Sequence, residues 1–292
     1  MPYCADNLST AGRESLLTLL AAFRLSSSYE GPILQLRRPS DGSLQDVYVD
    51  ANDSYRVGSS SSPSAQLVSD WLAPDVFGYL TVVYDQSGNQ KNAVQTDTSL
   101  QPKFNPADGF LDFKGGYFYM LMDVTSFDSG NSPYTWVVKH GQINNVYGGL
   151  FGIGNTAKDQ SLCMRREHGL NHEYWWANDC DLGSYAAGNV LAVTYDQTKR
   201  RGYVNGMLKA TINSLNHALV AQNAFLGNTI YRRVDESLKG ELFYLITSRM
   251  ALSDSDRQAL EHCVICSEGR CVAGKLYVLL LLCYRSVLME LL

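Results

Sequence analysis

The sequence predicts an all-β protein, built as a sandwich of two antiparallel sheets with a short N-terminal helix and a helical C-terminal tail. Short segments rich in β-branched and aromatic residues follow one another along the chain, and turn sequences separate them. No long helical pattern lies between these segments, which argues against parallel βαβ units. With 292 residues, 45% of them hydrophobic, the chain is long enough for one large core.

Composition excludes one class of partner. The net charge is −5 and no basic stripe is present, so we expect no nucleic-acid ligand. Residues 1–7 carry no Lys or Arg and do not resemble a secretion signal. In the apolar stretch 16–23, Leu16, Leu19, Leu20 and Phe23 recur at helical spacing, which predicts an amphipathic helix there.

The strands follow in order. Residues 33–38 and 44–49, joined by the turn sequence PSDG, predict a hairpin, and 66–72 a short helical turn. Residues 78–84 are a strong strand candidate. Further strands are expected over residues 110–113, 117–122, 134–139, 149–153, 173–176, 189–195, 201–204, 208–212 and 240–247. The dipeptide Asn205-Gly206 is a hairpin signal, and Ser253 is a helix N-cap. We expect one domain over residues 14–262 and an apolar, cysteine-containing tail over 263–292, helical or poorly ordered.

Seven cysteines, four of them after residue 262, do not predict a disulfide framework. Cys163 and Cys180 either pair in an oxidising compartment or are two buried thiols. The Cys263-x-x-Cys266 spacing hints at zinc, but the knuckle pattern lacks its fourth ligand, since position 276 is Leu. We therefore expect no metal at this position.

Two motifs carry a family resemblance. LSSSYEGP at 25–32 with LRRPSDG at 36–42, and YDQSGN at 84–89, together resemble the N-terminal part of the catalytic domain of arabinofuranosidase B enzymes. The resemblance spans residues 14–103 and implies a concanavalin A-like jelly-roll sandwich. After residue 103 the chain is similar only to a general laminin-G-like pattern, at 194–196 and 202–206.

The resemblance implies a retaining glycosidase with two carboxyl groups, a Glu nucleophile soon after a mid-domain Gly-Asn pair and an Asp acid after a late glycine-rich strand. The nearest counterparts, residues 154–157 and 227–229, contain no carboxylate, and the family's adjacent cysteine pair is absent. We therefore expect a non-catalytic glycan-binding or structural module on a cell or virion surface, with carbohydrate or other protein subunits as partners. A glycoside hydrolase acting on arabinose-containing polymers is the alternative.

Residues 165–181 are the densest polar and aromatic stretch. A sugar platform there would use Trp175, Trp176 and the polar groups of Arg166, Asn178 and Asp179. Strand alternation puts the two tryptophans on opposite faces, so that only one can meet a ligand and the other belongs to the core. The alternative is one core tryptophan beside a solvated charged loop.

Glu173 and Asp181 are the carboxylates available to a hydrolase in this stretch. His168 and His172 have helical i, i+4 spacing, but Gly169 and Asn171 argue against a helix, so a zinc pair is not expected.

Asp85 and Asn89 lie in a polar turn at a strand end. They either present oxygens to a sugar or to Ca²⁺, or bond the backbone of their own turn. No other cofactor is expected. The tail at 276–292 is too short to cross a bilayer and carries Arg285 and Glu290; it can contact a membrane surface or dock on a partner protein.

Overall fold

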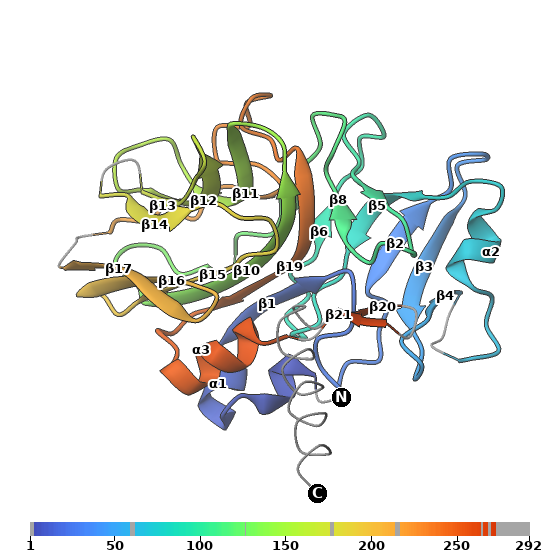
Figure 1. Cartoon of the computed structure of the whole chain (residues 1–292), viewed down its shortest axis with the longest axis horizontal. Helices are drawn as coiled ribbons and strands as arrows, with labels where there is room; N and C mark the ends of the chain where they lie inside the picture. The colour runs from blue at the N-terminus through green and yellow to red at the C-terminus, as the bar shows by residue number, and fades with distance from the viewer. Residues whose placement is uncertain are drawn as a thin grey trace, which may run out of the picture.

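The computed structural model describes residues 3–58, 62–125, 127–175, 178–213, 217–263, 265–267 and 270–272, and shows a two-layered β-sandwich (Figure 1). In chain order its elements are η1 (Cys4–Asn7), α1 (Thr10–Glu14), β1 (Leu16–Ala21), β2 (Leu34–Arg37), β3 (Leu44–Val49), β4 (Tyr55–Val57), α2 (Val68–Leu72), β5 (Gly78–Val83), β6 (Ala93–Val94), β7 (Lys103–Phe104), β8 (Leu111–Asp112), β9 (Met120–Met122), β10 (Tyr134–Ile143), β11 (Tyr147–Gly154), β12 (Ser161–Glu167), β13 (Leu170–Tyr174), β14 (Cys180–Ser184), β15 (Val190–Tyr195), β16 (Lys199–Val204), β17 (Met207–Asn213), β18 (Ala224–Leu226), β19 (Gly240–Ser248), α3 (Asp254–Glu261), β20 (Ile265–Ser267) and β21 (Arg270–Val272).

The strands pair antiparallel, as the sequence predicts. One layer runs β17-β16-β15-β10-β19-β8-β7-β5 and the other β14-β13-β12-β11-β18-β9-β6-β5, so the two layers join at β5. Strands β2, β3 and β4 continue outward from β5, and β1 pairs with β19. This arrangement confirms the predicted antiparallel sandwich.

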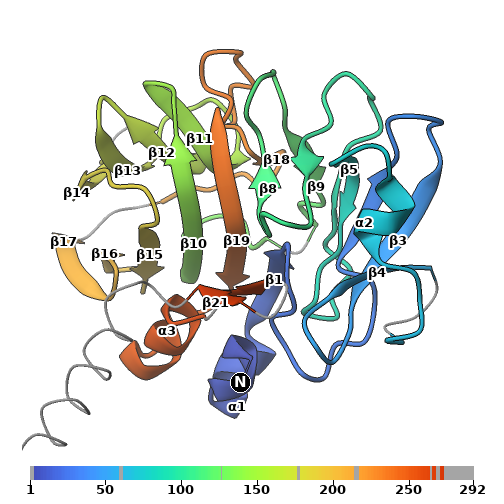
Figure 2. The ribbon, with the colours of Figure 1, turned by 45° about the vertical axis from the view of Figure 1, so that its right-hand side comes forward.

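The core is made by alternation along the strands. On β10, Trp136 and Val138 point between the two layers, whereas Val137 points to the opposite face. That face is covered by η1 and α3, whose Ala5 and Leu260 are buried against it, and α3 lies beneath the sheet in Figure 2. The middle of β10 is therefore buried on both faces, which explains why Trp136, Val137 and Val138 are all apolar.

The prediction of a helix at 16–23 is wrong, because Leu16–Ala21 form strand β1. Every side chain of β1 is buried: Leu20 belongs to the core between the layers, and Leu19 to the cluster under η1 and α3. A strand that is buried on both faces does not alternate between apolar and polar residues, so a helical spacing of its leucines can arise by chance. The short N-terminal helix is α1, which Ser9 caps by accepting a hydrogen bond from the backbone of Gly12 at 3.0 Å.

Other predictions are confirmed. Strands β3 and β5, helical segment α2 and the Ser253-capped helix α3 lie where the sequence places them. Strands β4, β6, β7, β12, β14 and β18 were not predicted. Within the expected tail, β20 and β21 form a hairpin, and residues 273–292 lie outside the described part of the chain. No helix among the described residues is long and apolar enough to span a membrane.

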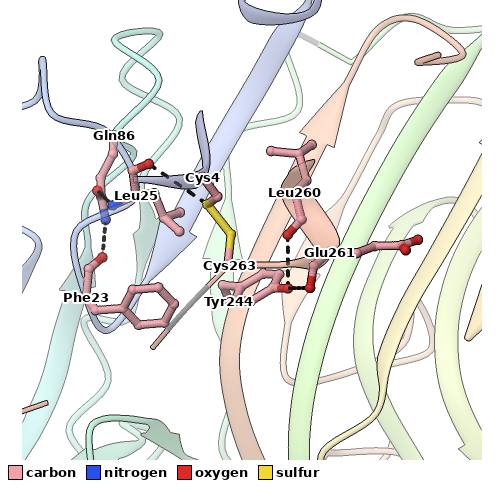
Figure 3. The surroundings of a disulfide bond; sticks show 8 residues. All are labelled: Cys4, Phe23, Leu25, Gln86, Tyr244, Leu260, Glu261 and Cys263. Atoms are coloured by element: carbon pink, nitrogen blue, oxygen red, sulfur yellow. Dashed lines mark hydrogen bonds between the residues drawn. A yellow bond between two sulfur atoms is a disulfide. The ribbon is translucent and has the colours of Figure 1, made fainter. Parts of the chain in front are cut away.

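A disulfide joins the two ends of the fold, Cys4 in η1 and Cys263 just after α3 (Figure 3). The sequence did not indicate this bond, because the two cysteines are 259 positions apart and the only spacing motif that contains Cys263 joins it to Cys266. Nearby, the Tyr244 hydroxyl donates to the carbonyl of Leu260 at 3.2 Å. Cys163 and Cys180 are free and buried, as in the second of the two interpretations of this pair.

Candidate functional site

The Asp85–Asn89 turn fastens strand β1 to the rest of the sandwich. Asp85 is buried, and one of its carboxylate oxygens accepts a hydrogen bond from the backbone of Leu19 at 2.8 Å. The other oxygen accepts from Lys91 N at 3.0 Å, and Asn89 donates to the carbonyl of Leu16 at 2.8 Å. Both side chains thus bond backbone, as in the turn interpretation, and the bonds reach a distant strand as well as the turn itself.

Trp175 is a core residue. It is fully buried; its ring packs against the imidazole of His217, with centroids 3.8 Å apart, and against the guanidinium of Arg200 at 3.9 Å. Its indole N–H donates to the hydroxyl of Tyr134 at 3.1 Å. A wholly buried ring cannot stack on a sugar, so Trp175 does not provide the expected platform. Trp176 lies outside the described residues.

Glu173 and Asp181 do not form a catalytic pair. Glu173 is fully buried, 3.1 Å from the guanidinium of Arg200, and accepts a hydrogen bond from Tyr134 at 2.6 Å. Its partner across β14 is Cys180, which is also buried, so Asp181 points to the opposite face and is exposed. The hydrolytic roles expected of these two residues are therefore incompatible with the geometry, since a glycosidase needs both carboxyls around one sugar.

The other residues predicted for the site form hydrogen bonds that fix loops in place. Arg166 donates to the carbonyls of Ile143 at 2.6 Å and Asn145 at 3.0 Å. Asn178 donates to Asp159 at 3.0 Å, and Asp179 accepts from the backbone of Trp175 at 3.1 Å. These bonds connect segments of the chain, and they do not gather Arg166, Asn178 and Asp179 around a common point.

A different group of side chains comes together on the face of β12 and β13 that is turned away from the core. Leu162 and Met164 of β12 point into the core, so Arg165 and Glu167 point the other way. The Arg165 guanidinium lies 2.6 Å from the carboxylate of Glu167 and 4.3 Å from the ring of Tyr174 on β13. It is only 8% exposed, so this cation is held in place by neighbours on several sides.

The loop after β18 completes this group. An added Cβ on Gly149 of β11 would lie 2.6 Å from the backbone nitrogen of Thr229. An added Cβ on Gly152 of the same strand would lie 2.8 Å from the backbone nitrogen of Ile230. Glycine at both positions therefore lets the loop pack directly on the sheet. The Thr229 hydroxyl donates to Glu236, whose carboxylate lies 4.0 Å from Arg165.

We call Arg165, Glu167, Tyr174, Tyr231 and Glu236 the Arg165 cluster. The hydroxyls of Tyr174 and Tyr231 are 3.4 Å apart, and both residues are partly exposed. Burial, followed by the hydrogen bond with Tyr174, raises the pKa of Tyr231, so its hydroxyl stays neutral near pH 7.

The cysteine beneath the cluster is not a nucleophile. Cys163 precedes Arg165 by two positions on β12 and is fully buried. Burial raises the pKa of its thiol to about 12, so the reactive thiolate is scarce at neutral pH. Hydrogen bonding and charge pairing are therefore the chemistry that the Arg165 cluster offers.

Sequence reasoning missed most of this cluster. Glu236 has no local motif and reaches Arg165 only because the loop folds back over β11. The two stretches to which the resemblance assigns the family's carboxylates lie near each other, since an added Cβ on Gly152 would lie 2.8 Å from the backbone nitrogen of Ile230. Among the described residues, no group of three or more His, Cys, Asp or Glu is arranged to hold a metal ion.

Comparison with known proteins gives a fold likeness. No protein-family model matches the sequence, and no curated protein matches it significantly. Among solved structures, a mutant GH54 α-L-arabinofuranosidase soaked with 4-nitrophenyl α-L-arabinofuranoside superposes with a TM-score of 0.69 at 15% identity, covering 89% of this chain and 64% of the other. An arabinofuranosidase complexed with arabinofuranosyl-α-1,2-xylobiose gives 0.66 at 15% identity, covering 84% and 61%.

This chain thus spans less than two thirds of the length of these enzymes. The expectations of a laminin-G-like relative and of a virion protein gain no support from the comparisons. At such low identity the likeness establishes the architecture, and the chain shares the β-sandwich fold of arabinofuranosidases.

Proposed function

We propose that this protein binds a carbohydrate at the Arg165 cluster and does not cleave it. The observation that carries the proposal is the Arg165 guanidinium set between Glu167, Glu236 and the ring of Tyr174 on a partly exposed sheet face. Carboxylates and tyrosine hydroxyls hydrogen-bond sugar hydroxyls, and aromatic rings pack on the C–H faces of sugars. The sandwich holds these groups on two adjacent strands and a packed loop, which reduces the ordering cost of binding.

The arrangement does not suit hydrolysis. A retaining glycosidase needs one carboxylate as nucleophile and one protonated carboxyl as acid, each facing the scissile bond. Here both carboxylates lie against the same guanidinium, at 2.6 Å for Glu167 and 4.0 Å for Glu236. An ion pair with Arg165 occupies oxygens that would have to attack or protonate the substrate.

The fold likeness suggests the first ligands to test. The neighbouring enzymes were solved with arabinofuranosyl compounds, so arabinofuranose-bearing oligosaccharides head the list, followed by other pentose and hexose glycans. The Cys4–Cys263 disulfide supports an oxidising location, such as the cell exterior, where such glycans are met.

A glycan array with the wild type and Tyr174→Ala tests binding. We expect the wild type to bind one class of glycan and Tyr174→Ala to lose this binding. The control variant Tyr48→Ala, which changes a partly exposed tyrosine on β3, should keep it. Binding to no glycan, or equal binding by both variants, would contradict the proposal.

A chromogenic arabinofuranoside tests the hydrolytic alternative. We expect no release of arabinose by the wild type. Release that disappears in both Glu167→Gln and Glu236→Gln would show that the cluster is catalytic after all.

A further inference from the structure

A separate groove with polar and apolar lining residues lies at the other end of the molecule, outside β2, β3 and β5. It has a volume of about 320 Å³, within the range of roughly 300–1,000 Å³ typical of small-ligand sites. Its lining consists of Gln35, Arg37, Gly42, Leu44, Thr81, Val82, Val94, Gln95, Thr96, Thr98 and Gln101. Figure 1 shows β2, β3 and β5 far from β12 and β13, which carry the Arg165 cluster. The groove is therefore independent of the function proposed above.

The polar side chains of the groove are fixed in place. The Thr81 hydroxyl donates to the side-chain oxygen of Gln35 at 2.9 Å, and the Gln35 amide donates to Asp46 at 3.1 Å. On the neighbouring segment, the Gln101 amide donates to the backbone carbonyl of Gln95 at 3.0 Å. Thr81, Gln95 and Gln101 are each less than a tenth exposed. Because their polar atoms already bond within the protein, these side chains form a rigid lining that holds Arg37 in place, which reduces the ordering cost of binding.

Arg37 is the only charged side chain of the lining. Its Nε donates to the side-chain oxygen of Gln101 at 2.9 Å, and its guanidinium lies over the ring of Tyr79, 4.5 Å from the centroid. Across the described part of the chain, no carboxylate lies within ion-pair distance of Arg37, in contrast to Arg38, which pairs with Asp41. An anchored guanidinium whose terminal nitrogens face no carboxylate is suited to bind a planar anion with two parallel hydrogen bonds.

We infer that this groove binds an acidic oligosaccharide, with the carboxylate of a uronic acid residue on Arg37. Thr96 and Thr98 are exposed in the lining, and their hydroxyls can bond the hydroxyls of a sugar chain. Val82 and Val94 provide an apolar surface for the C–H face of a ring. Arg37 is a single cation, so the groove can pair with one carboxylate of the bound oligosaccharide. A nucleic acid is a poorer match, because its phosphates would require a row of cations.

Calorimetric titration with trigalacturonate and with a hyaluronan hexasaccharide tests the inference on the full chain. Each carries uronates, and the methyl ester of trigalacturonate keeps the same ring and hydroxyls without the charge. We expect at least one acid to bind, and esterification or Arg37→Gln to weaken binding about tenfold or more. The matched control, Arg13→Gln, removes an equal charge from an exposed position on α1 and should leave the affinity unchanged.

Two further variants separate the possible failures. Val94→Glu adds a carboxylate at a position that is 36% exposed in the groove, so it should reduce binding of the acid more than binding of the ester. Arg165→Gln should not affect either titration, because the two sites are separate. The inference is overturned if neither acid binds at millimolar concentration, if acid and ester bind equally, or if the folded Arg37→Gln variant binds as the wild type does.

Discussion

Protonation of a buried histidine should destabilise this protein in mildly acidic solution. His217 is 2% exposed, stacks on Trp175 and shares a hydrogen bond of 3.0 Å between its Nε2 and the carbonyl of Ser161. Burial first, and then the positive charge of Arg200, lowers the pKa of His217 to about 4. An unfolded histidine titrates near its ordinary value of 6.5.

The sign and size of the change in unfolding free energy with pH follow from proton linkage. Between pH 6.5 and 4 the unfolded state binds a proton that the folded state excludes, so the stability present above pH 6.5 is lost as the pH falls. Lowering the pH from 7 to 5 costs about 2 kcal/mol of unfolding free energy through His217 alone. His140, fully buried and with its pKa lowered to about 4, chiefly by burial, adds a similar amount.

Urea unfolding at pH 7, 6 and 5 measures this effect in the wild type and in His217→Gln. The glutamine keeps an N–H donor, in its amide group, but has no titrating ring. The difference between the two proteins should shrink by about 2 kcal/mol from pH 7 to pH 5, because the wild type alone carries the penalty of this residue. His140→Gln should show the same convergence, and the double variant about twice as much. Parallel curves for the wild type and His217→Gln would refute the reasoning.

Four further outcomes are expected. Glu173→Gln leaves Arg200 buried without its counter-charge and should cost about 3–5 kcal/mol in urea unfolding, whereas methionine at both positions should recover most of the loss; equal losses would contradict this. Cys4→Ser should lower the unfolding free energy by about 2–5 kcal/mol under non-reducing conditions and change nothing in the presence of a reductant. Gly152→Ala places a Cβ 2.8 Å from the backbone of the loop after β18 and should cost about 1–3 kcal/mol and weaken glycan binding, which an unchanged array profile would disprove. Deletion of residues 264–292 should leave cooperative thermal unfolding intact, and a broad transition in calorimetry would show that the tail belongs to the core.

The sequence predicts the position of a strand best where the strand has one buried face and one exposed face. Residues 44–49 of β3 show such an alternation toward the end of the strand, and their predicted bounds agree with the structure. Strand β1 has no open face, so its leucines look helical. Strand β12 ends in Arg165 and Glu167, whose charges conceal a strand that is mostly buried.

The candidate site was less predictable than the fold, because it depends on contacts between distant segments. The aromatic and charged residues at 165–181 stand out in the sequence, but Trp175 and Glu173 face the interior and Asp181 faces outward. A one-residue change of strand position reverses the face of a side chain, and local sequence determines that position poorly. Glu236 and the loop that carries it can be assigned to the site only once the glycines of β11 are seen beneath them.

The bond between Cys4 and Cys263 turns the described fold into a covalent ring. A protease that cuts one peptide bond between these two cysteines opens the ring but releases no fragment, and a second cut is needed before a piece can diffuse away. Proteolysed molecules would therefore keep their mass on a non-reducing gel and separate into pieces only after reduction. A protein exposed to digestive enzymes gains a tolerance of single nicks that a linear chain of the same stability lacks.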